Sequence, residues 1–255
     1  VDTEKAGDGE DVVSILDMKA DLDDKILKIG EKISIRRFEK VTADVVASYI
    51  HGGGRIGVLV AGNGASDDAA KEALTNIAMQ IAAMNPQYIS RDEISADELA
   101  KMKEITIDSA LNDPFSLPKP VLSKLIEKAV AGVWSAEDVA IYEEKKSNMN
   151  FLPNFLSKEA KAQLAEIACA DKEEISGNKI FSGLVEGRIS KQMKEICLLD
   201  QVYVKAEDGK QTVAAYLKSV NPALKIAKFV RFEVGEGMEK KNEDFAAEVA
   251  KQMNV

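Results

Sequence analysis

The sequence predicts an α+β fold: a small, mostly antiparallel sheet is covered by helices, and an antiparallel helical arm protrudes from it. Strand-like and helix-like runs occur in mixed order, without the sustained alternation that builds a parallel sheet. Two apolar runs flank a glycine-rich turn near residues 51–54, which is typical of a β-hairpin. Helical stripes at 96–112 and 178–196 could pair as an antiparallel coiled coil that carries a helical insertion.

The N-terminal elements follow from local periodicity. Apolar residues recur at helical spacing over 18–29, and Gly30 follows as a stop signal. Residues 32–39 (KISIRRFE) and 44–50 (DVVASYI) are rich in β-branched and aromatic residues, which favours strands. The glycines after His51 lead into the run IGVLVA, which completes the predicted hairpin.

Two longer helices come next. Ser66 is the predicted N-cap of the first, which stops at Asn85-Pro86 because the residue before a proline disfavours the α conformation. Ser95 and Glu98 have the spacing of a capping box, so a second helix is expected to begin there and end near Asn112.

Residues 113–177 have a different character. A proline-rich connector, DPFSLPKP, is followed by short helical patterns near 120–131, 136–146 and 157–169. We therefore expect a helical insertion at the far end of the arm formed by residues 96–196.

The C-terminal part contains one more strand and one more helix. In FVRFEV (229–234), Val230 and Phe232 alternate with Arg231 and Glu233, which indicates a half-exposed strand. Glu243 to Met253 are expected to form a final helix. The predicted organisation is an acidic lead-in at 1–17, a core subdomain at 18–95 and 197–236, the arm at 96–196 and a helical module at 237–255.

Composition narrows the class of protein. The chain has 255 residues and a net charge of -9, and an acidic surface repels phosphate, so direct nucleic-acid binding is not expected. It contains no apolar run of about 18 residues and its first dozen residues do not form a signal peptide, which predicts a cytoplasmic protein without a membrane partner. The two cysteines form no CxxC pair, so neither a metal site nor a disulfide framework is expected. No cofactor is expected either.

The run SYIHGGGRIGVLVAGNG (48–64) allows three interpretations. HGGG resembles the oxyanion-hole loop of lipases, but His51 is the only histidine and no G-x-S-x-G motif supplies a nucleophile. Gly62-Asn63-Gly64 resembles a nucleotide-binding turn, but the third glycine is absent and Asp67 would repel a phosphate. The third interpretation is a hairpin with His51 at its tip. A small nucleotide-binding enzyme that uses the Gly62-Asn63-Gly64 turn and a self-associating helical-arm protein remain as alternatives.

Four separated blocks, in this order and spacing, resemble bacterial elongation factor Ts. They are KIGEKISIRRFEKV, SYIHGGGRIGVLVAGNG, EGRISKQMKEICLLDQVYV and FVRFEVGEGMEKKNEDFAAEVAKQM, and they extend from about residue 18 to the C-terminus. The resemblance implies a guanine-nucleotide exchange factor without covalent chemistry. Its implied partner is elongation factor Tu, in the GDP-bound and nucleotide-free forms, and a homodimer is a further expectation.

The resemblance also implies which residues contact the partner. Ile29 and Gly30 match a contact pair at the end of a helix, and His51 matches a hairpin-tip histidine that reaches domain 3 of the GTPase. Val204, in QVYV, matches a contact valine after the coiled coil. Asp244 and Phe245 belong to a C-terminal helix that docks on the nucleotide domain of the partner.

Two departures from the family pattern stand out. The family's N-terminal helical module and its Thr-Asp-Phe subdomain do not precede Val1, so we expect a fragment that lacks the N-terminal third. The insertion at 113–177 is much longer than the short turn common in the family, and the exchange mechanism does not assign it a role.

Overall fold

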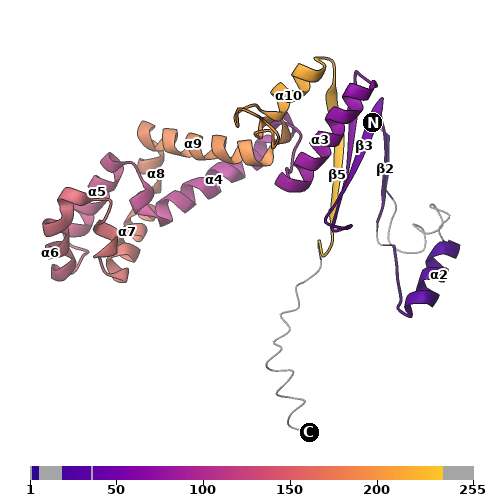
Figure 1. The fold of residues 1–255 in the computed structure, drawn as a ribbon. Helices are drawn as coiled ribbons and strands as arrows, with labels where there is room; N and C mark the ends of the chain where they lie inside the picture. Colours follow the sequence, from indigo (N-terminus) through magenta and orange to yellow (C-terminus); the bar gives the residue numbers. More distant parts are fainter. Residues whose placement is uncertain (1, 6–18, 36, 238–255) are drawn as a thin grey trace, which may run out of the picture. The chain divides into compact units, whose positions relative to one another are not determined.

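The structure is a computed structural model that describes residues 2–5, 19–35 and 37–237. It divides into two compact units (Figure 1). The first comprises Val1–Asn85 and Tyr203–Val255, and the second comprises Pro86–Val202. The C-terminal helix predicted at 243–253 lies outside the described residues.

The first unit confirms the predicted α+β class. Its elements are β1 (Asp2–Lys5), α2 (Lys19–Ile29), β2 (Glu39–Thr42), β3 (Val45–His51), β4 (Ile56–Asn63), α3 (Asp68–Met84), α10 (Val213–Val220) and β5 (Lys225–Glu233). β3, β4 and β5 form an antiparallel sheet in that order, while β1 and β2 pair antiparallel in a sheet of two strands.

The core of this unit forms where α3 packs on β3 and β4 (Figure 1). The buried side of α3 consists of Ala70, Ala73, Leu74, Ile77, Ala78, Gln80, Ile81 and Ala82. Strand residues Val58 and Val60 are buried with them. At Gly62 a Cβ would lie 3.0 Å from Leu74 Cδ1, so the absence of a side chain there lets the helix approach the sheet closely.

Three local predictions were wrong in detail. The described residues of 32–38 form no strand, and β2 begins at Glu39. β2 begins where Glu39 pairs with Lys5 of β1, so strand pairing and not β propensity alone sets its start. The Glu39 side chain also forms an ion pair with Lys228 of β5, at 2.8 Å. The N-cap of α3 is Asp67 and not Ser66, because the Asp67 carboxylate accepts the Ala70 N–H at 2.8 Å. The helical spacing of Leu74, Ile77, Ile81 and Met84 predicts that all four are buried, but Met84 is 47% exposed.

The second unit is helical. Its main helices are α4 (Ala96–Asn112), α5 (Lys119–Val130), α6 (Ala136–Lys145), α7 (Lys158–Ala170), α8 (Lys172–Ser176) and α9 (Lys179–Ile196). Short 3-10 turns lie between them at Pro114–Ser116, Lys146–Asn148 and Leu152–Asn154, and two more flank the series at Arg91–Glu93 and Leu198–Asp200. The capping box of Ser95 and Glu98 is present. α4 and α9 contact one another and run in opposite directions (Figure 1), while their coiled-coil packing stays a prediction.

One hydrophobic cluster joins the insertion to the arm. It contains Leu111 of α4 and Phe181 of α9 together with insertion residues such as Leu125 and Leu164. Trp134 lies in the same cluster, and its indole Nε1–H donates to the Ala160 carbonyl at 2.9 Å. The insertion therefore forms part of the core of the second unit.

A buried carboxylate links two helix starts within the insertion. Asp138, only 6% exposed, accepts hydrogen bonds from the Ser157 backbone N–H at 2.9 Å, the Ser157 hydroxyl at 2.9 Å and the Ser135 hydroxyl at 2.8 Å. Ser135 is the N-cap of α6 and Ser157 is the N-cap of α7. Burial raises the pKa of Asp138, but the donors from Ser157 and Ser135 outweigh it, so the pKa of this carboxyl is held below its ordinary value.

The base of the β3–β4 hairpin is closed by backbone and side-chain bonds. The Asp44 carboxylate accepts the Gly64 N–H at 2.9 Å, and the Asp44 N–H donates to the Asn63 side chain at 3.2 Å. Gly64 has a φ of +92°, and a Cβ there would lie 2.1 Å from the Ala223 carbonyl oxygen. Only glycine fits this position, for both its conformation and its space.

Replacing Asp138 by alanine should destabilise the second unit by about 1 to 3 kcal/mol near neutral pH, because it leaves the buried donors around it unpaired. Because the pKa of Asp138 is lowered in the fold, its contribution is complete above the pKa of about 3.9 of an unfolded aspartate. The contribution is lost as pH falls through the lower folded value. Thermal melts from pH 7 to pH 2 should show the stability difference between the parent and Asp138→Ala shrinking in acid; a constant difference would contradict this account.

Gly64→Ala should destabilise the first unit by about 2 to 4 kcal/mol, because the new Cβ collides with a backbone carbonyl. Gly53→Ala is the matched control: Gly53 has a φ of +66° but no atom within 4 Å of an added Cβ. The control should cost about 1 kcal/mol, the strain of a left-handed alanine. Urea unfolding of both variants measures the two values. Equal losses would show that the contact with Ala223 is not a constraint.

Candidate partner-binding site

His51 lies at the end of β3, where the chain enters the hairpin loop. It is exposed, and it pairs across the hairpin with Ile56 at the start of β4. The Tyr49 hydroxyl lies 3.0 Å from His51 Nδ1, and the centroids of the two rings are 5.8 Å apart. This contact orients the imidazole and leaves Nε2 for solvent or for a partner. The expectation that the hairpin presents an exposed His51 agrees with this geometry.

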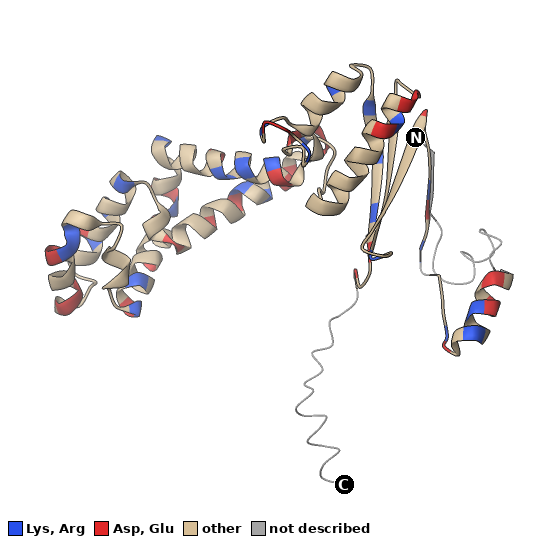
Figure 2. Cartoon of the chain, in the orientation of Figure 1, with Lys and Arg blue, Asp and Glu red and all other residues tan. Residues whose placement is uncertain are grey.

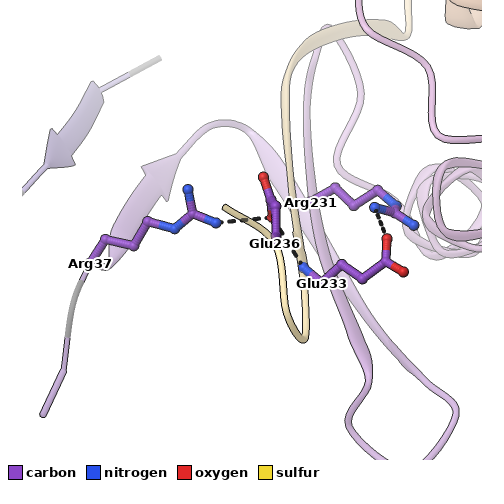
Figure 3. Close-up of polar contacts among 4 residues, drawn as sticks. All are labelled: Arg37, Arg231, Glu233 and Glu236. Carbon is purple, nitrogen blue, oxygen red and sulfur yellow. Dashed lines mark hydrogen bonds and ion pairs between the residues drawn. The ribbon is translucent and has the colours of Figure 1, made fainter. Parts of the chain in front are cut away.

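The segment after β5 is fastened beside the hairpin loop (Figure 3). The Val234 N–H donates to the Arg55 carbonyl at 2.9 Å. Glu236 accepts from the Arg37 guanidinium at 2.9 Å and from the Glu233 N–H at 3.3 Å. Because these bonds connect β5 both to the hairpin loop and to the segment before β2, the end of the sheet that bears His51 is held from two sides.

Arg231 departs from the predicted alternation of β5. Its side chain is only 12% exposed, although the pattern places it on the solvent side. The register sets Arg231 opposite Val58, and Val58 opposite Tyr49, so it shares the sheet face that carries His51. Arg231 forms an ion pair with Glu233 at 2.8 Å (Figure 3). The sequence alternation therefore identified the strand but assigned the arginine to the wrong environment.

Val204 lies in the loop that follows the second unit in the chain, and this residue is 48% exposed. Its backbone N–H donates to Gln80 Oε1 of α3 at 2.7 Å. Gln80 is 0% exposed and was not identified by the sequence reasoning. The sequence signal for the burial of Gln80 is its position next to Ile81 and near Ile77, on the apolar side of the helix.

The residues on either side of Val204 also make side-chain contacts within the first unit. The Tyr203 and Tyr216 rings stack with centroids 4.0 Å apart and an angle of 13° between their planes. Burial, together with a hydrogen bond to Tyr216, raises the pKa of Tyr203 well above its ordinary value, so the Tyr203 hydroxyl stays protonated near neutral pH. Lys205 Nζ donates to Asn76 Oδ1 at 2.7 Å.

Ile29 and Gly30 end α2. Ile29 is 60% exposed, and Leu27 of the same helix is 83% exposed. Gly30 has a φ of +78°, and its N–H donates to the Ile26 carbonyl at 2.8 Å, as in a left-handed helix C-cap. Within the described residues no hydrogen bond joins Ile29, His51 and Val204 to one another, so three separate elements present them. Asp244 and Phe245 lie outside the described residues.

The Gly62-Asn63-Gly64 turn is not shaped to hold a phosphate. A Cβ at Gly62 would meet Leu74 and Leu224, and the Gly64 N–H is already bonded to Asp44. The first turn of α3 is capped by the Asp67 carboxylate. The Gly64 and Ala70 N–H groups are therefore occupied by carboxylates within the fold, and these negative charges disfavour a phosphate at the turn.

Neither a hollow on the surface of the first unit nor a cluster of metal-ligating side chains offers a small-molecule site in the described residues. An open hollow of about 700 Å³ beside Val204 is lined by Lys205, Lys210, Glu207 and Asp208 together with the stacked tyrosines, and it does not enclose a ligand. No group of His, Cys, Asp and Glu side chains in the described part of the chain is arranged to hold a metal ion.

Basic and acidic side chains are interspersed along the described helices (Figure 2). Across the ranges that the structure describes, no helix combines the length and the apolar character that crossing a membrane requires.

Comparison with known proteins identifies the family to which this chain is similar. The family model described as "Elongation factor TS" matches residues 9–141 and 144–236. The elongation factor Ts of Clostridioides difficile (strain 630) is 36% identical over 260 residues, which cover 97% of this chain and 66% of that protein. That of Clostridium botulinum (strain Eklund 17B / Type B) is 36% identical over 235 residues, covering 89% and 57%. That of Halothermothrix orenii is 35% identical over 239 residues, covering 93% and 58%.

The chain thus spans between 57% and 66% of the lengths of these three relatives. The family match extends over both structural units, from the segment before α2 to the loop after β5. The chain belongs to the elongation factor Ts family.

Proposed function

We propose that this chain binds elongation factor Tu, in its GDP-bound and nucleotide-free forms, and promotes the release of GDP. Membership of the elongation factor Ts family supports the partner and the process, since the family resemblance implies exchange of guanine nucleotide. The chain covers only part of its relatives, so the activity is proposed for these residues and not inherited from the whole protein.

One observation carries the proposal most directly. The described residues that the resemblance assigns to partner contact are presented to solvent, although two of them are apolar. Ile29 is 60% exposed, Val204 is 48% exposed and His51 is exposed at the end of its hairpin. An isoleucine on an amphipathic helix is ordinarily a core residue, so its exposure favours a role in contact with another protein.

Nucleotide exchange needs no covalent chemistry in this chain. An exchange factor acts through a coupling free energy: it binds the GTPase better when the nucleotide is absent, and by reciprocity the nucleotide weakens its binding. Such coupling requires a broad, defined surface and no catalytic acid or base. Contacts presented by three separate elements of the first unit are suited to that requirement.

Several finer expectations remain proposals. We propose that the protein acts in the cytoplasm and that it contacts the GTPase without binding nucleic acid directly. The expected homodimer and the partner contacts of Asp244 and Phe245 stay predictions.

His51→Ala should weaken binding to elongation factor Tu by about 1 to 3 kcal/mol, as truncation of an interface hot spot does. The melting temperature should stay nearly unchanged, because the ring is exposed. Ser48→Ala is the matched control, since Ser48 is also exposed on β3 but points to the other face of the sheet. Calorimetric titration measures both affinities. A His51→Ala chain that binds as tightly as the control would remove the histidine from the interface.

The chain should accelerate loss of a fluorescent GDP from elongation factor Tu in a saturable manner, measured by stopped flow. Its affinity for the GTPase should fall when GDP is added, because a ligand that binds both states equally shifts nothing. An affinity that is unchanged across a GDP titration would show that binding and nucleotide are uncoupled, and the exchange proposal would then fail.

A further inference from the structure

The loop that carries Val204 is fixed by the outer part of α3. Gln80 accepts the Val204 N–H at 2.7 Å, and Asn76, one helical turn earlier, accepts from Lys205 Nζ at 2.7 Å. Asn76 also donates from Nδ2 to the Tyr216 hydroxyl at 2.9 Å. Tyr216 in turn stacks on Tyr203. Each of residues 203 to 205 therefore has its own contact with α3 or with a residue that α3 holds.

The side chain of Val204 is the part of this loop for which no such contact is described. The Val204 backbone N–H is bonded to Gln80, while the residue as a whole stays 48% exposed. Gln80 itself is 0% exposed, so its amide could not turn to water if the bond were broken. A buried acceptor without its donor costs about 1 to 3 kcal/mol, so the loop is held in this conformation before any partner arrives.

We infer that Gln80, assisted by Asn76, is a positioning residue for partner binding: it does not touch the partner but holds Val204 in the orientation in which it docks. The inference rests on the proposed function, because it takes Val204 as a contact. A loop that must be ordered on binding loses affinity to conformational entropy, and a loop that is ordered beforehand does not. The amide of Gln80 supplies that order at the centre of the loop.

A purely structural role for Gln80 makes a different prediction. A buried amide that only stabilises the core would lower the melting temperature and leave the affinity of the folded chain unchanged. Gln201 provides the matched control, because it is 1% exposed and its side-chain Nε2 donates to the Glu195 carbonyl at 2.7 Å, within the second unit. Both glutamines are buried and bonded to backbone, but only Gln80 bonds to Val204.

The test compares Gln80→Met with Gln201→Met in the full chain. Methionine keeps the volume of the side chain and removes the acceptor. Amide hydrogen exchange at Val204 should become about tenfold faster or more in Gln80→Met and stay at the parental rate in Gln201→Met. The dissociation constant for elongation factor Tu should rise about tenfold in Gln80→Met alone. Gln80→Glu, which keeps an acceptor oxygen, should recover part of the affinity.

The outcomes separate the two ideas. If the parent chain does not bind elongation factor Tu, or if Val204→Ala binds as the parent does, the proposed contact fails. If Val204→Ala weakens binding but Gln80→Met does not, the positioning role fails while the contact stands. Equal losses of affinity in Gln80→Met and Gln201→Met would also overturn the role. Should Gln80→Met not fold, Asn76→Ala removes the second amide from a half-buried position, and it should weaken binding by a smaller factor.

Discussion

The packing of α3 against the β3–β4–β5 sheet is the interaction on which the first unit depends. It requires Gly62, where any side chain would press on Leu74, and it buries the apolar side of the helix against Val58 and Val60. The same helix turns Asn76 and Gln80 toward the loop at 203–205. One helix therefore completes the core and also fixes a loop that the family resemblance assigns to the partner surface, so the stability of the fold and the shape of that surface are linked.

The glycine-rich stretch at 48–64 takes its meaning from this packing. Its last glycines let the chain leave β4 against Leu224 and Ala223 and enter α3, and their backbone groups are used within the fold. Its first glycines make the loop that follows His51. A stretch that resembles a phosphate-binding turn therefore has two structural roles. Its last glycines join the hairpin to α3, and its first glycines form the loop beside the exposed His51.

The elements set by local signals could be predicted from sequence. α2, the hairpin and the capping box at Ser95 follow from periodicity, turn glycines and cap spacing, and all three are present. What depends on distant partners could not be predicted. The bond between Gln80 and Val204 joins residues 124 apart in the sequence, and the burial of Arg231 and Asp138 depends on neighbours that no local pattern names. The start of β2 was misplaced for the same reason, because β2 begins where it pairs with β1, more than 30 residues earlier in the chain.

We propose that the partner surface belongs to the first unit and includes His51 and Val204, whose surroundings hold each of them in place. The most direct measurement places a photo-activated cross-linking amino acid at position 51, 204 or 133 in separate chains and irradiates each with elongation factor Tu. Position 133 is Val133, an apolar residue of the second unit that is 44% exposed. Positions 51 and 204 should cross-link to the GTPase, and added GDP should reduce both yields. Cross-linking from position 133 alone would contradict the account.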